Sequence, residues 1–327
     1  MFQQRRRTAP SDRTTNRLII ASILVLVIGI PLIGVLYFFD QYRPAGPSLV
    51  DRDIEVAEEA VTTDPNLLTA RLALAQAYTR KGRFADAIAQ FDQILTVAPD
   101  AGSALLGRGA AAIALDRLDQ ARADFQRIVD LARDGEMANV DPQLESAYYS
   151  LGVIALREGR AEDAVLNLAD AVRIKRTDAD ALHLLGTALL QAGEPERAVT
   201  ATRQAIALVP IGWCEPYAQL AAAYTALADP AGTGYATGML ALCEERPDDA
   251  RAALTPLVSG PYAVDALVGL GLLAETRNDT AAAADAYSKA LEHDPTDFAA
   301  TTGLARVGGA QTDAPATSPS TGPSGGG

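Results

Sequence analysis

The residues that most often carry catalytic and metal chemistry are scarce in this sequence. Cysteine and histidine each occur twice in 327 residues, as Cys214, Cys243, His183 and His293. A metal centre built on these side chains needs three or four of them close together, and the sequence contains no H-E-x-x-H and no paired C-x-x-C pattern. We therefore expect no metal, no cofactor and no enzymatic activity.

Aromatic residues and lysines are also rare. Aromatic residues make up 6% of the chain, whereas 49% is apolar, and much of that share is alanine, the best helix former. The 41 acidic residues outnumber the 28 basic ones, and residues 1–39 hold five arginines and one aspartate, so the acidic charge belongs to the rest of the chain. Nucleic acid needs a cationic face, and an acidic helical body therefore excludes it as a partner. The excess of arginine over lysine is typical of a GC-rich bacterial source.

One segment near the N-terminus is long and apolar enough to cross a membrane. Residues 18–39, LIIASILVLVIGIPLIGVLYFF, carry no charge, and a helix of this length spans about 33 Å, enough for the hydrocarbon core of a bilayer. A cleaved signal peptide has a shorter apolar region followed by small residues, which the continuation DQYRPAG does not provide. We expect a transmembrane helix that contacts the lipid bilayer.

The flanking charges predict the orientation of this helix. Arginines are concentrated before it, and cytoplasmic flanks carry the excess of basic residues. Residues 1–17 are expected to form a basic cytoplasmic tail and residues 40–49 a linker. The result would be a single-pass protein of the cell membrane whose main body lies outside the cytoplasm, in the periplasm or at the external surface.

The remainder of the chain repeats one pattern. The stretch RKGRFADAIAQFDQILTVAP (80–99) returns as REGRAEDAVLNLADAVRI (157–174) and QAGEPERAVTATRQAIALVP (191–210), and Pro65 and Pro99 are 34 residues apart. The spacing L-A-x2-Y … A-x3-F … P in the first copy is made by Leu74, Ala75, Tyr78, Ala87, Phe91 and Pro99. This copy resembles the tetratricopeptide repeat (TPR) family, whose units are 34-residue helical hairpins.

The resemblance covers roughly residues 66–297 and implies an all-α TPR solenoid, a right-handed superhelix of hairpins, over residues 50–307. The expected repeats are 66–99, 100–133, 145–178, 179–212 and 264–297, with an irregular unit at 213–262, capping helices at 50–65 and 297–307, and a disordered tail at 308–327. Within 213–262 the helix pairing stays open, because residues 231–243 could be the partner of 217–228 or another first helix.

Small residues and glycines have defined roles in this pattern. Ala75, Gly152, Gly186 and Gly271 occupy the position where the two helices of a hairpin press together. Gly82, Gly159 and Gly193 follow first helices, and we expect them to adopt the left-handed conformation that ends a helix.

In the TPR family, the second, fifth, ninth and twelfth residues of each first helix line the concave surface. Carried onto this sequence, the resemblance implies a partner-binding groove that includes Leu72, Gln76, Leu106, Ile113, Tyr149, Val153, Leu156, His183 and Leu190. The Lys and Asn residues with which some TPR domains grip a terminal carboxylate are absent from these positions. The apolar strip suits an apolar or amphipathic segment of a partner protein, unless neighbouring helices cover it.

The two cysteines allow a disulfide. If residues 215–228 and 231–243 form a hairpin, Cys214 and Cys243 lie side by side in a compartment that permits oxidation. The alternative is a pair of buried thiols.

Together these features predict a membrane-tethered, non-enzymatic scaffold or adaptor that binds a protein segment during assembly, maturation or secretion at the cell envelope. The alternative is a permanent structural subunit of a membrane complex, whose groove is always filled.

Overall fold

The computed structural model describes residues 30–33, 35, 37–38, 48–209 and 212–312. From residue 48 onward these residues form a succession of helices without strands. The helices are α2 (Leu49–Thr63), α3 (Leu68–Arg80), α4 (Phe84–Val97), α5 (Gly102–Ala114), α6 (Leu118–Ala132), α7 (Pro142–Arg157), α8 (Ala161–Ile174), α9 (Ala179–Gln191), α10 (Pro195–Leu208), α11 (Glu215–Ala226), α12 (Pro230–Cys243), α13 (Pro247–Leu254), η1 (Thr255–Leu257), α14 (Ala263–Thr276), α15 (Thr280–His293) and α16 (Phe298–Thr312).

No helix in the described part of the chain is both long and apolar enough to span a membrane. Most of the predicted transmembrane segment at 18–39 lies outside the described residues, as do the basic tail at 1–17 and most of the linker at 40–49. The structure therefore leaves the membrane anchor as a prediction from the sequence.

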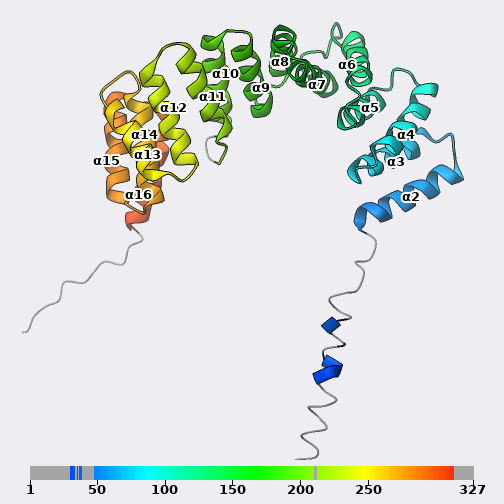
Figure 1. Cartoon of the computed structure of the whole chain (residues 1–327), viewed down its shortest axis with the longest axis horizontal. Helices are drawn as coiled ribbons and strands as arrows, with labels where there is room; N and C mark the ends of the chain where they lie inside the picture. Colours follow the sequence, from blue (N-terminus) through cyan, green and yellow to red (C-terminus); the bar gives the residue numbers. More distant parts are fainter. Residues whose placement is uncertain (1–29, 34, 36, 39–47, 210–211, 313–327) are drawn as a thin grey trace, which may run out of the picture.

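The helices stack as hairpins along an arc. Figure 1 shows α3, α5, α7 and α9 toward the inner side of the arc and α4, α6 and α8 toward the outer side. The hairpins α3–α4, α5–α6 and α9–α10 lie inside the expected repeats 66–99, 100–133 and 179–212, whereas α7 begins at Pro142, before the expected start of its repeat at residue 145. Pro142 is the first residue of α7 and Asp141 caps it, so the end of the expected loop insert is helical. The buried apolar residues form successive clusters along the stack, and the fully buried Phe91, Phe125 and Leu168 contribute to them from the second helices.

Small residues on the first helices let the paired helices approach closely. A Cβ added at Gly152 would lie 2.5 Å from Cγ of Leu168, and one at Gly186 would lie 2.6 Å from Oγ1 of Thr202. Both contacts are closer than carbon atoms tolerate, so the predicted role of these glycines is confirmed. The same holds at Gly271, where an added Cβ would collide with the ring of Tyr287.

The turns inside the hairpins share a left-handed residue. The backbone φ angles of Gly82, Gly159 and Gly193 are +78°, +70° and +76°, as predicted. Four other turns place a residue with a side chain in the same region: Asp116, Ala228, Glu245 and Asn278. Left-handed geometry costs such residues free energy that glycine avoids.

The irregular unit contains three helices in place of two. Helix α12 packs against both α11 and α13. It is thus the hairpin partner of α11 and also precedes α13 as a first helix, so both pairings considered for residues 231–243 are realised. Pro256 prevents α13 from continuing as a regular helix and a 3-10 turn follows.

The ends of the solenoid differ slightly from the predicted bounds. Helix α2 begins after Ser48, which accepts from the backbone N–H of Asp51, while the Asp51 side chain accepts from the backbone N–H of Ser48. At the other end α16 continues to Thr312, beyond the predicted end of the cap at residue 307. The buried Val307 anchors this helix, and no proline interrupts it before Pro315.

Candidate functional site

The predicted groove residues lie on the four first helices α3, α5, α7 and α9. Eight of the nine are half-buried and Gln76 is exposed. Leu72, Leu106 and Ile113 pack against the core of the N-terminal hairpins. Leu156 and Leu190 pack against the next core cluster, and Tyr149 touches both. The apolar strip is therefore partly covered by the core and partly accessible.

A buried polar cluster interrupts the strip between α9, α10 and α11. Nε2 of Gln219 donates to the backbone oxygen of His183 (3.0 Å) and to Oγ1 of Thr187 (2.9 Å). Within the described residues, Nδ1 of His183, Oγ1 of Thr202 and Oε1 of Gln219 are buried without a hydrogen-bond partner. Burial lowers the pKa of His183, because it disfavours the charged form of the imidazole.

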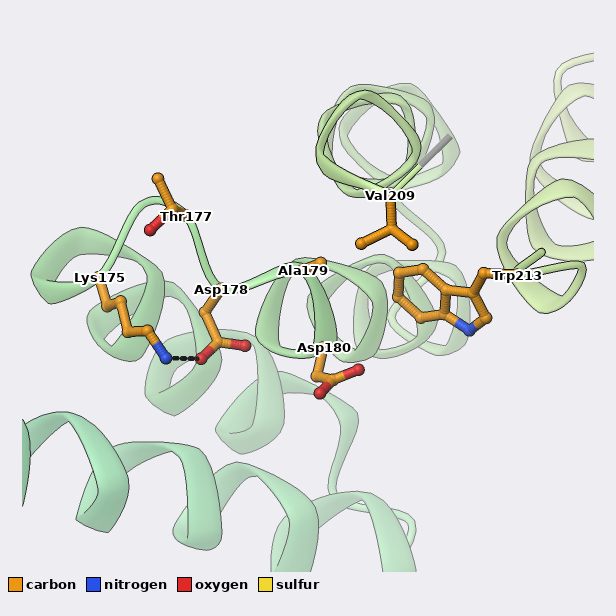
Figure 2. Close-up of a pocket in the computed structure, with 7 residues that line it drawn as sticks. All are labelled: Lys175, Thr177, Asp178, Ala179, Asp180, Val209 and Trp213. Carbon is orange, nitrogen blue, oxygen red and sulfur yellow. Dashed lines mark hydrogen bonds and ion pairs between the residues drawn. The ribbon is translucent and has the colours of Figure 1, made fainter. Parts of the chain in front are cut away.

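Trp213 lies beside this cluster and forms one wall of a hollow of about 400 Å³. Its ring meets the His183 ring edge-on with centroids 5.1 Å apart. Figure 2 shows the indole turned toward the start of α9, where Ala179 and Asp180 lie. Asp178 is engaged by Lys175 (2.6 Å) and caps α9, whereas the Asp180 carboxylate has no hydrogen bond or ion pair in the described part of the chain. The indole face and this carboxylate suit a cationic side chain.

Cys214 and Cys243 form a disulfide in the structure. Their sulfur atoms are 1.99 Å apart and their Cα atoms 5.6 Å apart. Cys214 immediately precedes α11 and Cys243 is the last residue of α12. The bond therefore ties together the open ends of this hairpin, next to Trp213.

A second cavity, of about 450 Å³, opens between the C-terminal helices. We call it the C-terminal pocket. Its lining residues are Arg203, Ile206 and Ala207 of α10, Tyr217 of α11, Tyr235 and Met239 of α12, Asp265, Val268 and Leu272 of α14, Asp297 preceding α16, and Phe298, Ala299, Thr302 and Arg306 of α16. Apolar side chains from five helices thus converge on one space.

The positional rule for the groove could have located this pocket. When the positions of a first helix are counted from residue 264, the second, fifth and ninth are Asp265, Val268 and Leu272. Counted from residue 298, they are Ala299, Thr302 and Arg306. All six line the pocket. The sequence-based groove ended at α9 and omitted them.

The charged groups around the C-terminal pocket are paired. Nη2 of Arg203 lies 3.1 Å from Oδ1 of Asp265, and Nε of Arg306 lies 2.7 Å from Oε2 of Glu275. The hydrogen bond from Arg306 is the main cause of the lowered pKa of Glu275. Burial raises the pKa of Tyr217 to about 12. The pocket therefore presents an apolar interior with neutralised charges at its edges.

In the described residues, no three or more His, Cys, Asp or Glu side chains gather where they could hold a metal ion.

A comparison with models of known protein families identifies the repeats. A model of the tetratricopeptide repeat matches residues 72–136 and 235–298. The first match covers α3 to α6, where hairpins with the expected small residues are observed. These segments of the chain are tetratricopeptide repeats.

The second match clarifies the irregular unit of the TPR array. It begins inside α12 and ends at the start of α16, so it spans α12, α13, α14 and α15. In this register α12 is a first helix and the short α13 is its second helix. Helix α11 is then an additional helix, joined to α12 by the disulfide.

Solved structures with a similar arrangement are TPR proteins of low sequence identity. The crystal structure of MamA is 22% identical, with a TM-score of 0.49, and the match covers 55% of this chain and 93% of MamA. The C-terminal part of a TPR repeat-containing protein from Cytophaga hutchinsonii is 18% identical (TM-score 0.47; 78% and 94% covered). YrrB, described as a TPR protein with an unusual peptide-binding site, is 16% identical (TM-score 0.44; 69% and 99% covered). No curated protein gave a significant sequence match.

Proposed function

We propose that this TPR protein is a membrane-tethered, non-enzymatic adaptor that holds a segment of a partner protein against its inner face. The observation that carries the proposal is the strip of half-buried apolar side chains on α3, α5, α7 and α9. These side chains pack partly against the core and leave part of their apolar surface accessible. An accessible apolar surface of this kind favours the docking of another apolar surface.

The chemistry of the strip suits an amphipathic helix or an extended apolar segment. Leu106, Ile113 and Tyr149 offer the apolar contacts, while Asp180 beside Trp213 offers a place for a basic residue of the partner. The net charge of −13 adds a weak, salt-dependent attraction for basic partners.

The proposed location is the outer side of a cell membrane, with residues 18–39 as the anchor. Two features support it: the uncharged length of that segment and the arginines that precede it. A disulfide between Cys214 and Cys243 suits an oxidising compartment. An adaptor in this place would keep its partner near the bilayer during assembly, maturation or secretion at the envelope.

The test is photo-cross-linking of the full-length protein in native membranes. We expect p-benzoylphenylalanine at Tyr149 or Leu156 to capture the same partner. Leu166 provides a matched control, because it is an apolar residue of the second helix α8 and is 67% exposed. Equal capture from all three positions, or capture from Leu166 alone, would contradict a groove on the inner face.

The same experiment separates the adaptor from a permanent subunit. A transient partner is lost when membranes are diluted before irradiation, whereas a permanent one is captured at an unchanged yield. Protease added to the outside of intact cells tests the orientation, since the repeats should be degraded and full protection would contradict it.

A further inference from the structure

The first residue of α16 presents an aromatic ring to solvent. Phe298 is 83% exposed, the largest value among the large apolar side chains of the described residues. A single exposed apolar side chain needs no explanation. Phe298, however, lies on the rim of the C-terminal pocket, so that an exposed ring and an apolar cavity are neighbours on one surface.

The interior of the pocket suits an apolar ring better than a charged group. Tyr217, Tyr235 and Met239 are buried and line the pocket together with Val268 and Leu272. Aromatic rings and a thioether sulfur make favourable contacts with another ring.

The charged residues at its edge already have partners. Arg203 binds Asp265, Arg306 binds Glu275, and Asp297 accepts a hydrogen bond from the backbone N–H of Ala300 (2.7 Å). A charged ligand would have to displace one of these pairs, whereas an apolar ring would displace only solvent.

Two segments of the chain could in principle fill the pocket from within, and neither fits. Residues 313–327, DAPATSPSTGPSGGG, contain no large apolar or aromatic side chain. The apolar residues 18–39 precede α2, and Figure 1 shows α2 at the opposite end of the arc from α16. A second copy of the chain, by contrast, brings a Phe298 on the same rim as its own pocket.

We infer that this face is a self-association surface, in which Phe298 of one copy enters the C-terminal pocket of a second copy and the reverse contact forms at the same time. A ring and a cavity on one surface are self-complementary about a two-fold axis, because each copy gives and receives the same contact. The neighbouring pocket-lining residues of α16, Ala299 and Thr302, are small and allow two α16 helices to approach closely. This inference does not depend on the proposed groove at α3 to α9.

A cross-link from position 298 tests the contact directly. The full-length protein carrying Phe298→p-benzoylphenylalanine is expressed in light and heavy isotopic forms, and the two are mixed and irradiated. We expect light–heavy products joined at residues 235–239 or 265–272. Products within a single copy only, or products with another protein, would overturn the inference.

Two variants measure the contribution of each half of the contact to self-association. Phe298→Ala removes the ring from an exposed position, and Val268→Trp fills the pocket. Each should weaken self-association of the full-length chain in mild detergent by at least about tenfold, as expected for a central aromatic contact. Leu49→Ala is the matched control, because Leu49 is 78% exposed at the other end of the arc and should leave association unchanged.

Mixing the two variants distinguishes the contact from misfolding. A Phe298→Ala copy retains an open pocket and a Val268→Trp copy retains its ring, so the mixed pair keeps one of the two contacts. We expect the mixture to associate more strongly than either variant alone. A wild-type chain that stays monomeric at every concentration, or a mixture no better than the separate variants, would overturn the inference.

Discussion

At the scale of single residues, the clearest departures from ideal TPR chemistry are the turns. Gly82 and Ala228 occupy equivalent left-handed turns, with φ of +78° and +54°. The left-handed region costs a residue with a Cβ roughly 1–2 kcal/mol, part of which is offset because alanine restricts the unfolded chain. The backbone at Ala228 is therefore strained in a way that a glycine would avoid.

Replacing Ala228 by glycine should raise the free energy of unfolding by about 1 kcal/mol, because it relieves this strain. Denaturant unfolding monitored by circular dichroism measures the change. The reverse substitution, Gly82→Ala, serves as the control and should lower stability by a similar amount. Equal stability of both variants and the wild type would show that the turns are not strained.

The lowered pKa of His183 makes stability depend on pH. Burial is the main cause, and the hydrogen-bonding and charged neighbours Gln219, Glu215 and Asp180 oppose it. The histidine of the unfolded chain takes up a proton near pH 6.5, while the half-buried imidazole of the folded chain stays neutral to a lower pH. The unfolded state thus binds more protons between these two pKa values. Stability from this group is complete above about pH 6.5 and falls as the pH drops toward the folded pKa.

Unfolding measured between pH 7.5 and 5 should show this loss in the wild type and a smaller loss in His183→Gln. His293→Gln is the matched control, because it also replaces a histidine, but one that is exposed at the end of α15 and is not part of the cluster around Gln219. Identical pH profiles for the wild type and His183→Gln would contradict the role of the buried imidazole.

At the scale of helices, the disulfide defines the unusual α11–α12 pair. The bond joins residues separated by 29 positions, and closing a loop of that size stabilises the folded state by about 3.5 kcal/mol on the chain-entropy account. Reduction, or the Cys214→Ser/Cys243→Ser variant, should lower the free energy of unfolding by up to that amount. Reductant should have no effect on the double variant. Alkylation of two thiols in the non-reduced protein would contradict the bond.

The sequence predicts the regular helices well and the irregular ones poorly, for a physical reason. Leu74, Ala75 and Phe91 are buried between the helices of one hairpin. Such contacts involve residues at a fixed spacing along the chain, so a sequence pattern can predict them. The second role of α12 depends on what packs on its other face, including α13 and Tyr262, whose hydroxyl donates to Asp229 (2.6 Å). Spacing along the chain carries no information about such a contact.

The residues of the candidate site also divide into those that the repeat pattern predicts and those that it does not. Positions on the inner face follow from the repeat register, so Leu72 and its counterparts could be assigned to first helices from sequence. The cluster of His183, Thr202 and Gln219 could not, because it forms only where side chains of three helices meet. The repeat register could have predicted the residues of the C-terminal pocket, but only if α16 had been recognised as a further first helix of the array.

At the scale of the whole molecule, the ion pair that joins the most widely separated positions of the described residues lies near the C-terminal end. A solenoid is held mainly by contacts between neighbouring repeats. Here the Arg203–Asp265 pair joins α10 to α14 across 62 residues, and the disulfide closes α11 on α12. Helix α2 is attached through side-chain contacts such as Tyr78 to Glu58 (2.6 Å) and has a neighbour on one side only.

This asymmetry predicts a gradient of local stability. Hydrogen exchange followed by mass spectrometry should show slow exchange in α11, α12 and α14 and faster exchange in α2 and α3. The Arg203–Asp265 ion pair must break before α10 and α14 separate, and the disulfide limits how far α11 and α12 can move apart. Arg203→Gln should accelerate exchange in α10 and α14 while leaving α4 to α6 unchanged. Lys289→Gln removes an exposed pair within α15 and is the control, which should leave the gradient intact. Uniform exchange along the array would mean that these links add nothing beyond neighbour stacking.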